Sequence, residues 1–105
     1  MKRIYLAGPM TGLPEFNYPA FHAEAARLRQ LGYHVENPAE INPEGGDWAA
    51  CMRRDIPQLI ACDTIALLPG WDKSKGARLE YHVATELGMQ VRTACQITEP
   101  ARSAA

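Results

Sequence analysis

Short continuous apolar runs alternate along this chain with stretches in which apolar residues recur at helical spacing. The runs at residues 2–7 and 63–68 predict two strands. The second run, DTIALL, is apolar on both faces, as a central parallel strand requires. Shorter runs at residues 33–36 and 89–92 predict two more strands, and residues 93–97 extend the last of them.

A first helix is predicted between the first two strands. Asn17 can cap its amino terminus, and Gly32 stands where a carboxyl-terminal cap belongs. Its apolar positions recur at helical spacing and are Phe21, Ala25 and Leu28.

Two further helices are predicted in the second half of the chain. The second helix begins after the capping residue Asp47 and contains Pro57, which should kink it. Its apolar stripe is formed by Trp48, Met52, Ile56, Leu59 and Ile60. The third helix covers residues 76–88, and its apolar side carries Leu79, Val83 and Leu87.

The alternation of strand and helix predicts an α/β protein. We expect a three-layer, Rossmann-like or flavodoxin-like fold with a mostly parallel sheet of four to five strands. Residues 1–97 should form a single domain and residues 98–105 a disordered tail. Such sheets bind ligands beyond the carboxyl ends of their strands, where the strand order reverses. The loops predicted at those ends are residues 8–16, 37–46 and 69–75.

Composition narrows the class of protein. The chain has 105 residues, of which 47% are hydrophobic and 22% charged, typical of one globular domain. A formal net charge of −1 argues against nucleic acid as a partner, and no apolar run is long enough for a membrane span. The amino terminus does not resemble a signal peptide. Three cysteines without a CxxC pair indicate a cytoplasmic location. The sequence predicts no metal and no cofactor.

Glu80 is the first candidate for chemistry. It lies at the start of the third predicted helix, just after the loop that follows the central strand. The positive end of the helix dipole favours an ionised carboxylate there. The alternative is an ordinary surface glutamate in an exposed first turn.

Asp55 is the second candidate. At 100° per residue it falls between Trp48 and Leu59 on the apolar stripe of the second helix. A carboxylate in that place is costly unless it is paired or faces a cleft. The alternatives are an ion pair with Arg53 or Arg54, or exposure at the predicted kink.

The loop WDKSKG at residues 71–76 is a third candidate. Ser74, the Gly76 amide and the start of the helix could hold a phosphate or a sugar hydroxyl, with Lys73 and Lys75 adding charge. A solvated lysine loop is the alternative.

The other loops give weaker indications. GPMTG at residues 8–12 lacks the GxGxxG spacing of a dinucleotide-binding loop, so a nicotinamide cofactor has little support. The aromatic residues Phe16, Tyr18 and Phe21 could include a platform for a nucleobase, although Phe21 suits the core better.

Several of these strings resemble one family. IYLAGPM, the central strand with its loop, and GARLEYHVATELG resemble the nucleoside 2-deoxyribosyltransferase superfamily, which includes the 2'-deoxynucleoside 5'-monophosphate N-hydrolases. GLPEFNYPAFHAEAARLRQLGY and LLPGWDKSKGARLE are closer to a small bacterial and phage branch described as a domain of unknown function, DUF4406-like. The resemblance covers residues 3–92.

The resemblance implies roles for three residues. Glu80 in GARLE matches the glutamate that attacks the anomeric carbon, and Asp55 in RRDIPQLIACD matches an aspartate that assists at the nucleobase or the sugar. Ser74 matches a serine that contacts the sugar or its 5'-phosphate. The candidate substrate-binding residues are Tyr5, Gly8, Pro9, Met10, Asn17, Asp72, Ser74 and Gly76.

The function that follows is cleavage of the N-glycosidic bond of a nucleoside or nucleoside 5'-monophosphate, by hydrolysis or by transfer. The reaction passes through an oxocarbenium-like state that a carboxylate can trap. The alternative is a non-catalytic nucleotide-binding or sensor module of the same fold. The partner is a small-molecule nucleoside or nucleotide, and the resemblance implies a homo-oligomer, a dimer or a tetramer.

Overall fold

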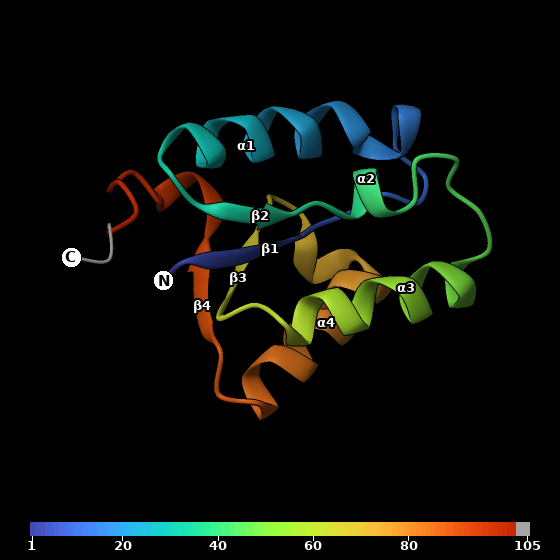
Figure 1. The fold of residues 1–105 in the computed structure, drawn as a ribbon. Coiled ribbons are helices and arrows are strands. Elements are labelled where there is room, and N and C mark those ends of the chain that lie inside the picture. The colour runs from blue at the N-terminus through green and yellow to red at the C-terminus, as the bar shows by residue number, and fades with distance from the viewer. Residues whose placement is uncertain (103–105) are drawn as a thin grey trace.

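Four parallel strands form the middle layer of the computed structural model, which describes residues 1–102 (Figure 1). The strand order is β2-β1-β3-β4, and every neighbouring pair is parallel. The strands are β1 (Arg3–Ala7), β2 (His34–Glu36), β3 (Thr64–Leu67) and β4 (Gln90–Thr93). The predicted α/β fold with a mostly parallel sheet of four to five strands is therefore confirmed, with four strands in the described residues.

Helices cover both faces of this sheet. The α-helices are α1 (Tyr18–Gln30), α2 (Pro38–Ile41), α3 (Trp48–Ile60) and α4 (Lys75–Glu86). Figure 1 shows α1 over one face of the sheet, with α3 and α4 over the other. The longest helices, α1 and α3, have 13 residues each, and none in the described residues has the length and apolar character of a membrane span.

The central strand β1 supplies both halves of the core. Its side chains alternate between the two faces, as in every strand. Ile4 and Leu6 pack in the apolar cluster on the α1 side, while Tyr5 and Ala7 belong to the cluster on the side of α3 and α4. All four are fully buried. β1 therefore directs Tyr5 toward the side of the sheet covered by α3 and α4.

The helix ends agree with the sequence in part. The Asp47 side chain accepts a hydrogen bond from the Ala50 amide at 3.1 Å, so the predicted cap of α3 is confirmed. Gly32 has a φ of 98° just after α1, as predicted for a carboxyl-terminal cap. Asn17 precedes α1, but its side chain makes no capping bond and donates instead to the Pro9 carbonyl oxygen at 3.1 Å. The helix α3 contains Pro57, continues past it and ends at Ile60.

The predicted apolar side of the third helix is wrong for two of its three residues, since only Val83 packs against the core. Leu79 and Leu87 are 39% and 59% exposed, whereas the buried residues of α4 are Ala77, Glu80 and Ala84. The two alanines let the helix approach the sheet closely and bring the glutamate inside. Burial follows from small side chains here, which a search for large apolar residues does not detect.

The segments predicted as loops or as extended chain also contain local structure. α2 and the 3₁₀ turns η1 (Pro14–Asn17) and η2 (Trp71–Lys73) lie within the predicted loops. The last strand does not extend to residue 97, because a 3₁₀ turn η3 (Ala94–Gln96) follows β4. The Arg27 guanidinium on α1 donates to the carbonyl oxygens of Ala94 and Ile97, each at 2.8 Å, and satisfies this turn.

The expected disordered tail is wrong for residues 98–102. The Ala101 amide donates to the Leu31 carbonyl oxygen at 2.8 Å, and the Tyr33 hydroxyl donates to the Glu99 carbonyl oxygen at 2.8 Å. Ala101 packs against the apolar cluster on the α1 side. These contacts join the end of the chain to the turn after α1, while residues 103–105 lie outside the described residues.

The two phenylalanines of the chain allow a matched test of this core. Phe21 is 1% exposed and Phe16 is 56% exposed. We expect Phe21→Ala to lower the free energy of unfolding by about 3–5 kcal/mol, because it leaves a cavity between α1 and the sheet. Phe16→Ala should change it by less than about 0.5 kcal/mol. Urea unfolding monitored by circular dichroism measures both, and equal losses would contradict the packing.

Candidate active site

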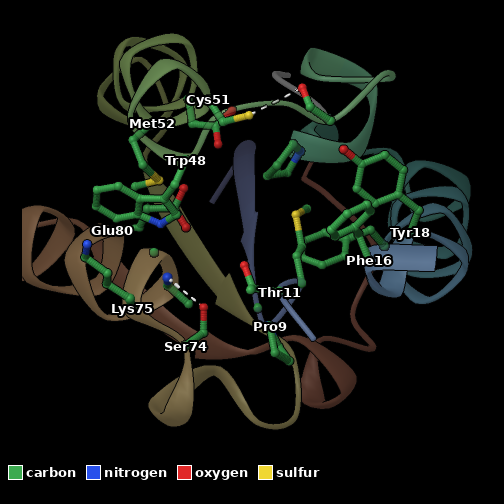
Figure 2. Close-up of a pocket in the computed structure, with 18 of the residues that line it drawn as sticks. Pro9, Thr11, Phe16, Tyr18, Trp48, Cys51, Met52, Ser74, Lys75 and Glu80 are labelled. Atoms are coloured by element: carbon green, nitrogen blue, oxygen red, sulfur yellow. Dashed lines mark hydrogen bonds between the residues drawn. The ribbon is translucent and has the colours of Figure 1, made fainter. Parts of the chain in front are cut away.

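A cavity opens at the carboxyl ends of β1 and β3, where the strand order switches direction (Figure 2). Its volume is about 580 Å³, within the range of small-molecule sites. The walls come from residues 8–11 after β1, the start of α1, the segment leading into α3, and the start of α4. This is the edge of the sheet at which the sequence predicted a ligand site.

Glu80 lies at the bottom of this cavity and is 4% exposed. It stands in the second turn of α4, so it is not the first-turn residue that the sequence suggested. Burial raises its pKa to about 8; a hydrogen bond from Tyr5 lowers it, and the charge of Asp55 raises it further. Desolvation therefore outweighs the expected favourable effect of the helix amino terminus.

Tyr5 holds the Glu80 carboxylate from below. Its hydroxyl donates a hydrogen bond to Oε2 of Glu80. Burial raises the pKa of Tyr5 well above its ordinary value, and the charge of Glu80 adds to the effect, so the phenol stays protonated and remains a donor. Tyr5 is fully buried and does not line the cavity, so it can position Glu80 but has no surface for a ligand.

Asp55 reaches the same cavity from α3 and is 5% exposed. Its Oδ1 accepts a hydrogen bond from Nδ2 of Asn42 at 2.7 Å. Burial raises its pKa to about 6, against the lowering effects of this hydrogen bond and of Arg54. In the described part of the chain Asp55 forms no ion pair with Arg53 or Arg54, so the alternative of a structural ion pair does not describe its surroundings.

Aromatic rings stand on opposite sides of the cavity. Figure 2 shows Phe16 and Tyr18 on one side, with Trp48 and Lys75 facing them from the other. The Lys75 Nζ lies 3.9 Å from the centre of the Trp48 ring, a cation–π contact. A flat ligand could therefore contact an aromatic face on either side, next to the positive charge of Lys75.

The start of α4 forms the end of the cavity. Ser74 caps the helix, and its Oγ accepts a hydrogen bond from the Ala77 amide at 3.2 Å. The first amides of a helix have no partner within the helix and can bind an anion. A side chain at Gly76 would lie 3.3 Å from Nε1 of Trp48 and 3.4 Å from Sδ of Met52. Glycine at this position therefore keeps space between α3 and α4.

The structure brings together seven of the ten residues predicted for the site. Those that line the cavity are Gly8, Pro9, Met10, Asp55, Ser74, Gly76 and Glu80. The other three, Tyr5, Asn17 and Asp72, do not line it. Tyr5 acts through Glu80, and Asn17 fixes the loop after β1 through the Pro9 carbonyl oxygen. Asp72 lies in η2, next to the wall residue Lys73.

Other residues around the cavity were not predicted for the site. From α3, Cys51 lines the cavity, and so do Trp48 and Met52, which were assigned only to the apolar stripe of this helix. Asn42 directly follows the short helix α2; it does not line the cavity but donates a hydrogen bond to Asp55. No pattern in the sequence marks Asn42, because its contact with Asp55 depends on how α2 and α3 pack.

Residues 2–93 match the family described as a domain of unknown function, DUF4406. The chain belongs to this family. The match covers all four strands and both helices that carry the carboxylates.

A solved structure extends the comparison beyond the family. The fold is similar to that of a 2-deoxyribosyltransferase from the psychrotolerant bacterium Bacillus psychrosaccharolyticus, described as a biocatalyst for nucleoside synthesis. The TM-score is 0.66 and the sequence identity 25%, over 85% of this chain and 69% of that one. The predicted resemblance to the nucleoside 2-deoxyribosyltransferase superfamily is thereby confirmed. Among curated proteins, none matches this sequence.

The raised pKa of Glu80 predicts how stability changes with pH. The folded chain keeps a proton on Glu80 up to about pH 8, whereas the unfolded chain releases it near pH 4.5, the ordinary pKa of a glutamate. Stability should therefore fall as the pH rises between these values. The side chain of Glu80→Gln cannot ionise. The free energy of unfolding of this variant should therefore rise relative to that of the wild type by a few kcal/mol, on the order of the linkage effect, as the pH increases across this window.

The exposed Glu86 on the same helix provides the control. Glu86→Gln should keep the pH dependence of the wild type, measured as the free energy of unfolding in urea at pH 4.5, 6.5 and 8.5. Parallel curves for wild type and Glu80→Gln would show that Glu80 ionises as freely in the folded chain as in the unfolded one.

Proposed function

We propose that this protein cleaves the N-glycosidic bond of a nucleoside or nucleoside 5'-monophosphate, with Glu80 as nucleophile and Asp55 as general acid. The observation that carries the proposal is the pair of buried carboxylates, held on different helices and facing one cavity of nucleoside size. The fold similarity to a 2-deoxyribosyltransferase supports the same chemistry.

In the first step a carboxylate oxygen of Glu80 forms a bond to the anomeric carbon of the sugar. The bond from that carbon to the base nitrogen breaks, and its electron pair leaves with the base. The Tyr5 hydroxyl donates to Oε2 of Glu80, which holds the carboxylate in place and stabilises its charge. Glu80 must be ionised for this attack.

Asp55 completes the first step by giving its proton to the departing base. Its pKa of about 6 suits a group that donates and recovers a proton near neutral pH. In the second step water attacks the anomeric carbon of the glycosyl ester and gives hydrolysis, or a second base attacks it and gives transfer, and the Asp55 carboxylate takes the proton that the acceptor loses. Either acceptor restores the Glu80 carboxylate.

Different walls of the cavity would bind different parts of the substrate. The rings of Phe16, Tyr18 and Trp48 offer apolar faces for the base. Ser74 and the first amides of α4 lie where the 5' end of the sugar would be held, beside Lys75.

The proposal includes assembly of the chain into a homo-oligomer, a dimer or a tetramer. Apolar side chains on the outer face support it, because Leu87 on α4 is 59% exposed and Val91 on the edge strand β4 is 38% exposed. A cytoplasmic location accords with free cysteines on this chain.

Base release from a panel of ribo- and deoxyribonucleosides and their 5'-monophosphates tests the reaction. Wild-type protein should release free base from at least one of them, as measured by chromatography. Glu80→Ala should lower the rate at least about a thousandfold, because the nucleophile is lost. Glu86→Ala, at an exposed position of the same helix, should retain the wild-type rate.

Two results would contradict the reaction. Undiminished release by Glu80→Ala would exclude Glu80 as the nucleophile. Saturable binding of a nucleotide without release of base, in the presence or absence of an acceptor base, would instead favour the non-catalytic module.

The two pKa values predict the pH dependence of base release. The active form needs ionised Glu80, with a pKa of about 8, and protonated Asp55, with a pKa of about 6. At pH 7 about one molecule in a hundred holds this combination. The rate should rise up to about pH 6, stay level, and fall above about pH 8, with both limits belonging to the coupled pair.

Asp55→Asn separates the two groups. This variant should be slower, and its rate should increase with pH up to about 8 without falling afterwards, since only Glu80 then titrates. A profile that keeps the alkaline decrease would show that another group supplies the proton. The measurement is kcat/KM for the best substrate between pH 5 and 9.5.

A further inference from the structure

Asn42 lies at the centre of a buried polar network beside the cavity. It follows α2 and is 5% exposed. Its Nδ2 donates to Oδ1 of Asp55 at 2.7 Å, and its Oδ1 accepts from Nε of Arg54 at 2.6 Å. A single amide thus connects an arginine at the surface to the carboxylate in the cavity.

The surrounding groups fix the orientation of this amide. The Asn42 Nδ2 also contacts the Pro38 carbonyl oxygen at 3.4 Å. A flipped amide would set its oxygen against this carbonyl and against the Asp55 carboxylate, and its NH₂ against the Arg54 guanidinium. Arginine can only donate and a carbonyl oxygen can only accept, so one orientation satisfies every partner.

The main chain of Asn42 is fixed as well. The Tyr18 hydroxyl, from the aromatic wall of the cavity, donates to the Asn42 carbonyl oxygen at 2.5 Å. Tyr18 therefore links the wall that would contact the base to the residue that contacts the acid.

The Asn42 contact makes the two oxygens of Asp55 unequal. Oδ1 faces an N–H donor, and a proton on that oxygen would face another hydrogen. Oδ2 receives no hydrogen bond from the described residues. A protonated Asp55 therefore carries its proton on Oδ2.

We propose that Asn42 is a positioning residue: it keeps Oδ1 of Asp55 as an acceptor, so that the transferable proton is held on Oδ2, and Arg54 keeps Asn42 in that orientation. The role in catalysis rests on the function proposed above, whereas the effect on Asp55 does not.

Other charged groups around Asp55 would act differently. Glu80 on α4 faces it, and so do the phenols of Tyr5 on β1 and Tyr18 on α1. Arg54 is the cation that favours its ionised form. Asn42 supplies the direct hydrogen bond, so its removal should raise the pKa of Asp55 and also allow the proton to occupy either oxygen.

The first test is a ¹³C NMR titration of aspartate carboxyl carbons in the complete chain, with Asp55 assigned by its loss in Asp55→Asn. In Asn42→Leu, which keeps the size of the side chain, the pKa of Asp55 should rise by about one unit. Arg54→Gln should raise it by about half a unit, because it removes both a charge and the group that orients Asn42.

Arg53 provides the matched control. It is an exposed neighbour on the same helix and makes no contact with Asn42 among the described residues. Arg53→Gln removes the same charge and should shift the pKa of Asp55 by less than about 0.2 units. Equal shifts in the two arginine variants, or an unchanged pKa in Asn42→Leu, would overturn the proposal. Arg54→Gln changes only an exposed side chain, so it keeps the test open if Asn42→Leu does not fold.

Base release supplies a second readout. In Asn42→Leu the acidic limit of the pH profile should move up with the new pKa of Asp55, while KM changes less than about twofold. If no substrate releases base, the reaction proposed above fails, while the titration still decides whether Asn42 controls Asp55. A KM effect alone, with the acidic limit unmoved, would overturn the positioning role.

Discussion

The hydrogen bond from Tyr5 to Glu80 is the contact on which the site depends. It joins β1 to α4, the helix that follows β3, and both side chains are almost fully buried. Burial alone favours the neutral form of Glu80, because desolvating a carboxylate is unfavourable. The Tyr5 phenol offsets part of this desolvation penalty by donating a hydrogen bond to the ionised form. Placing a carboxylate here therefore requires a buried donor, a closely packed helix and an opening on one side only.

Sequence patterns predicted the features that local chemistry decides. The apolar run over residues 63–68 gave β3 within a residue or so at each end, and Asp47 caps α3 as expected. The seven predicted residues on the cavity wall were found because parallel strands end at one edge of the sheet.

Features that depend on packing between distant elements were missed. The buried face of α4 is formed by two alanines and Glu80, so leucines marked the wrong side. The contact of Asn42 with Asp55 depends on how α2 meets α3. The segment 98–102 is held in part through main-chain atoms of Glu99 and Ala101, which leave no pattern of residue types.

The loop after β1 has one more consequence. Residues 15–17 all have positive φ, an unfavourable conformation for residues other than glycine. Asn17 closes this segment onto the Pro9 carbonyl oxygen, and the Pro9 ring lies 3.2 Å from the place where a side chain at Gly70 would begin. The two ends of the loop from Pro9 to Asn17 are thus joined by a hydrogen bond, and the loop packs against the turn after β3. Phe16 of the aromatic wall belongs to this loop, so an insertion or deletion there would shift the wall and change which ligands fit.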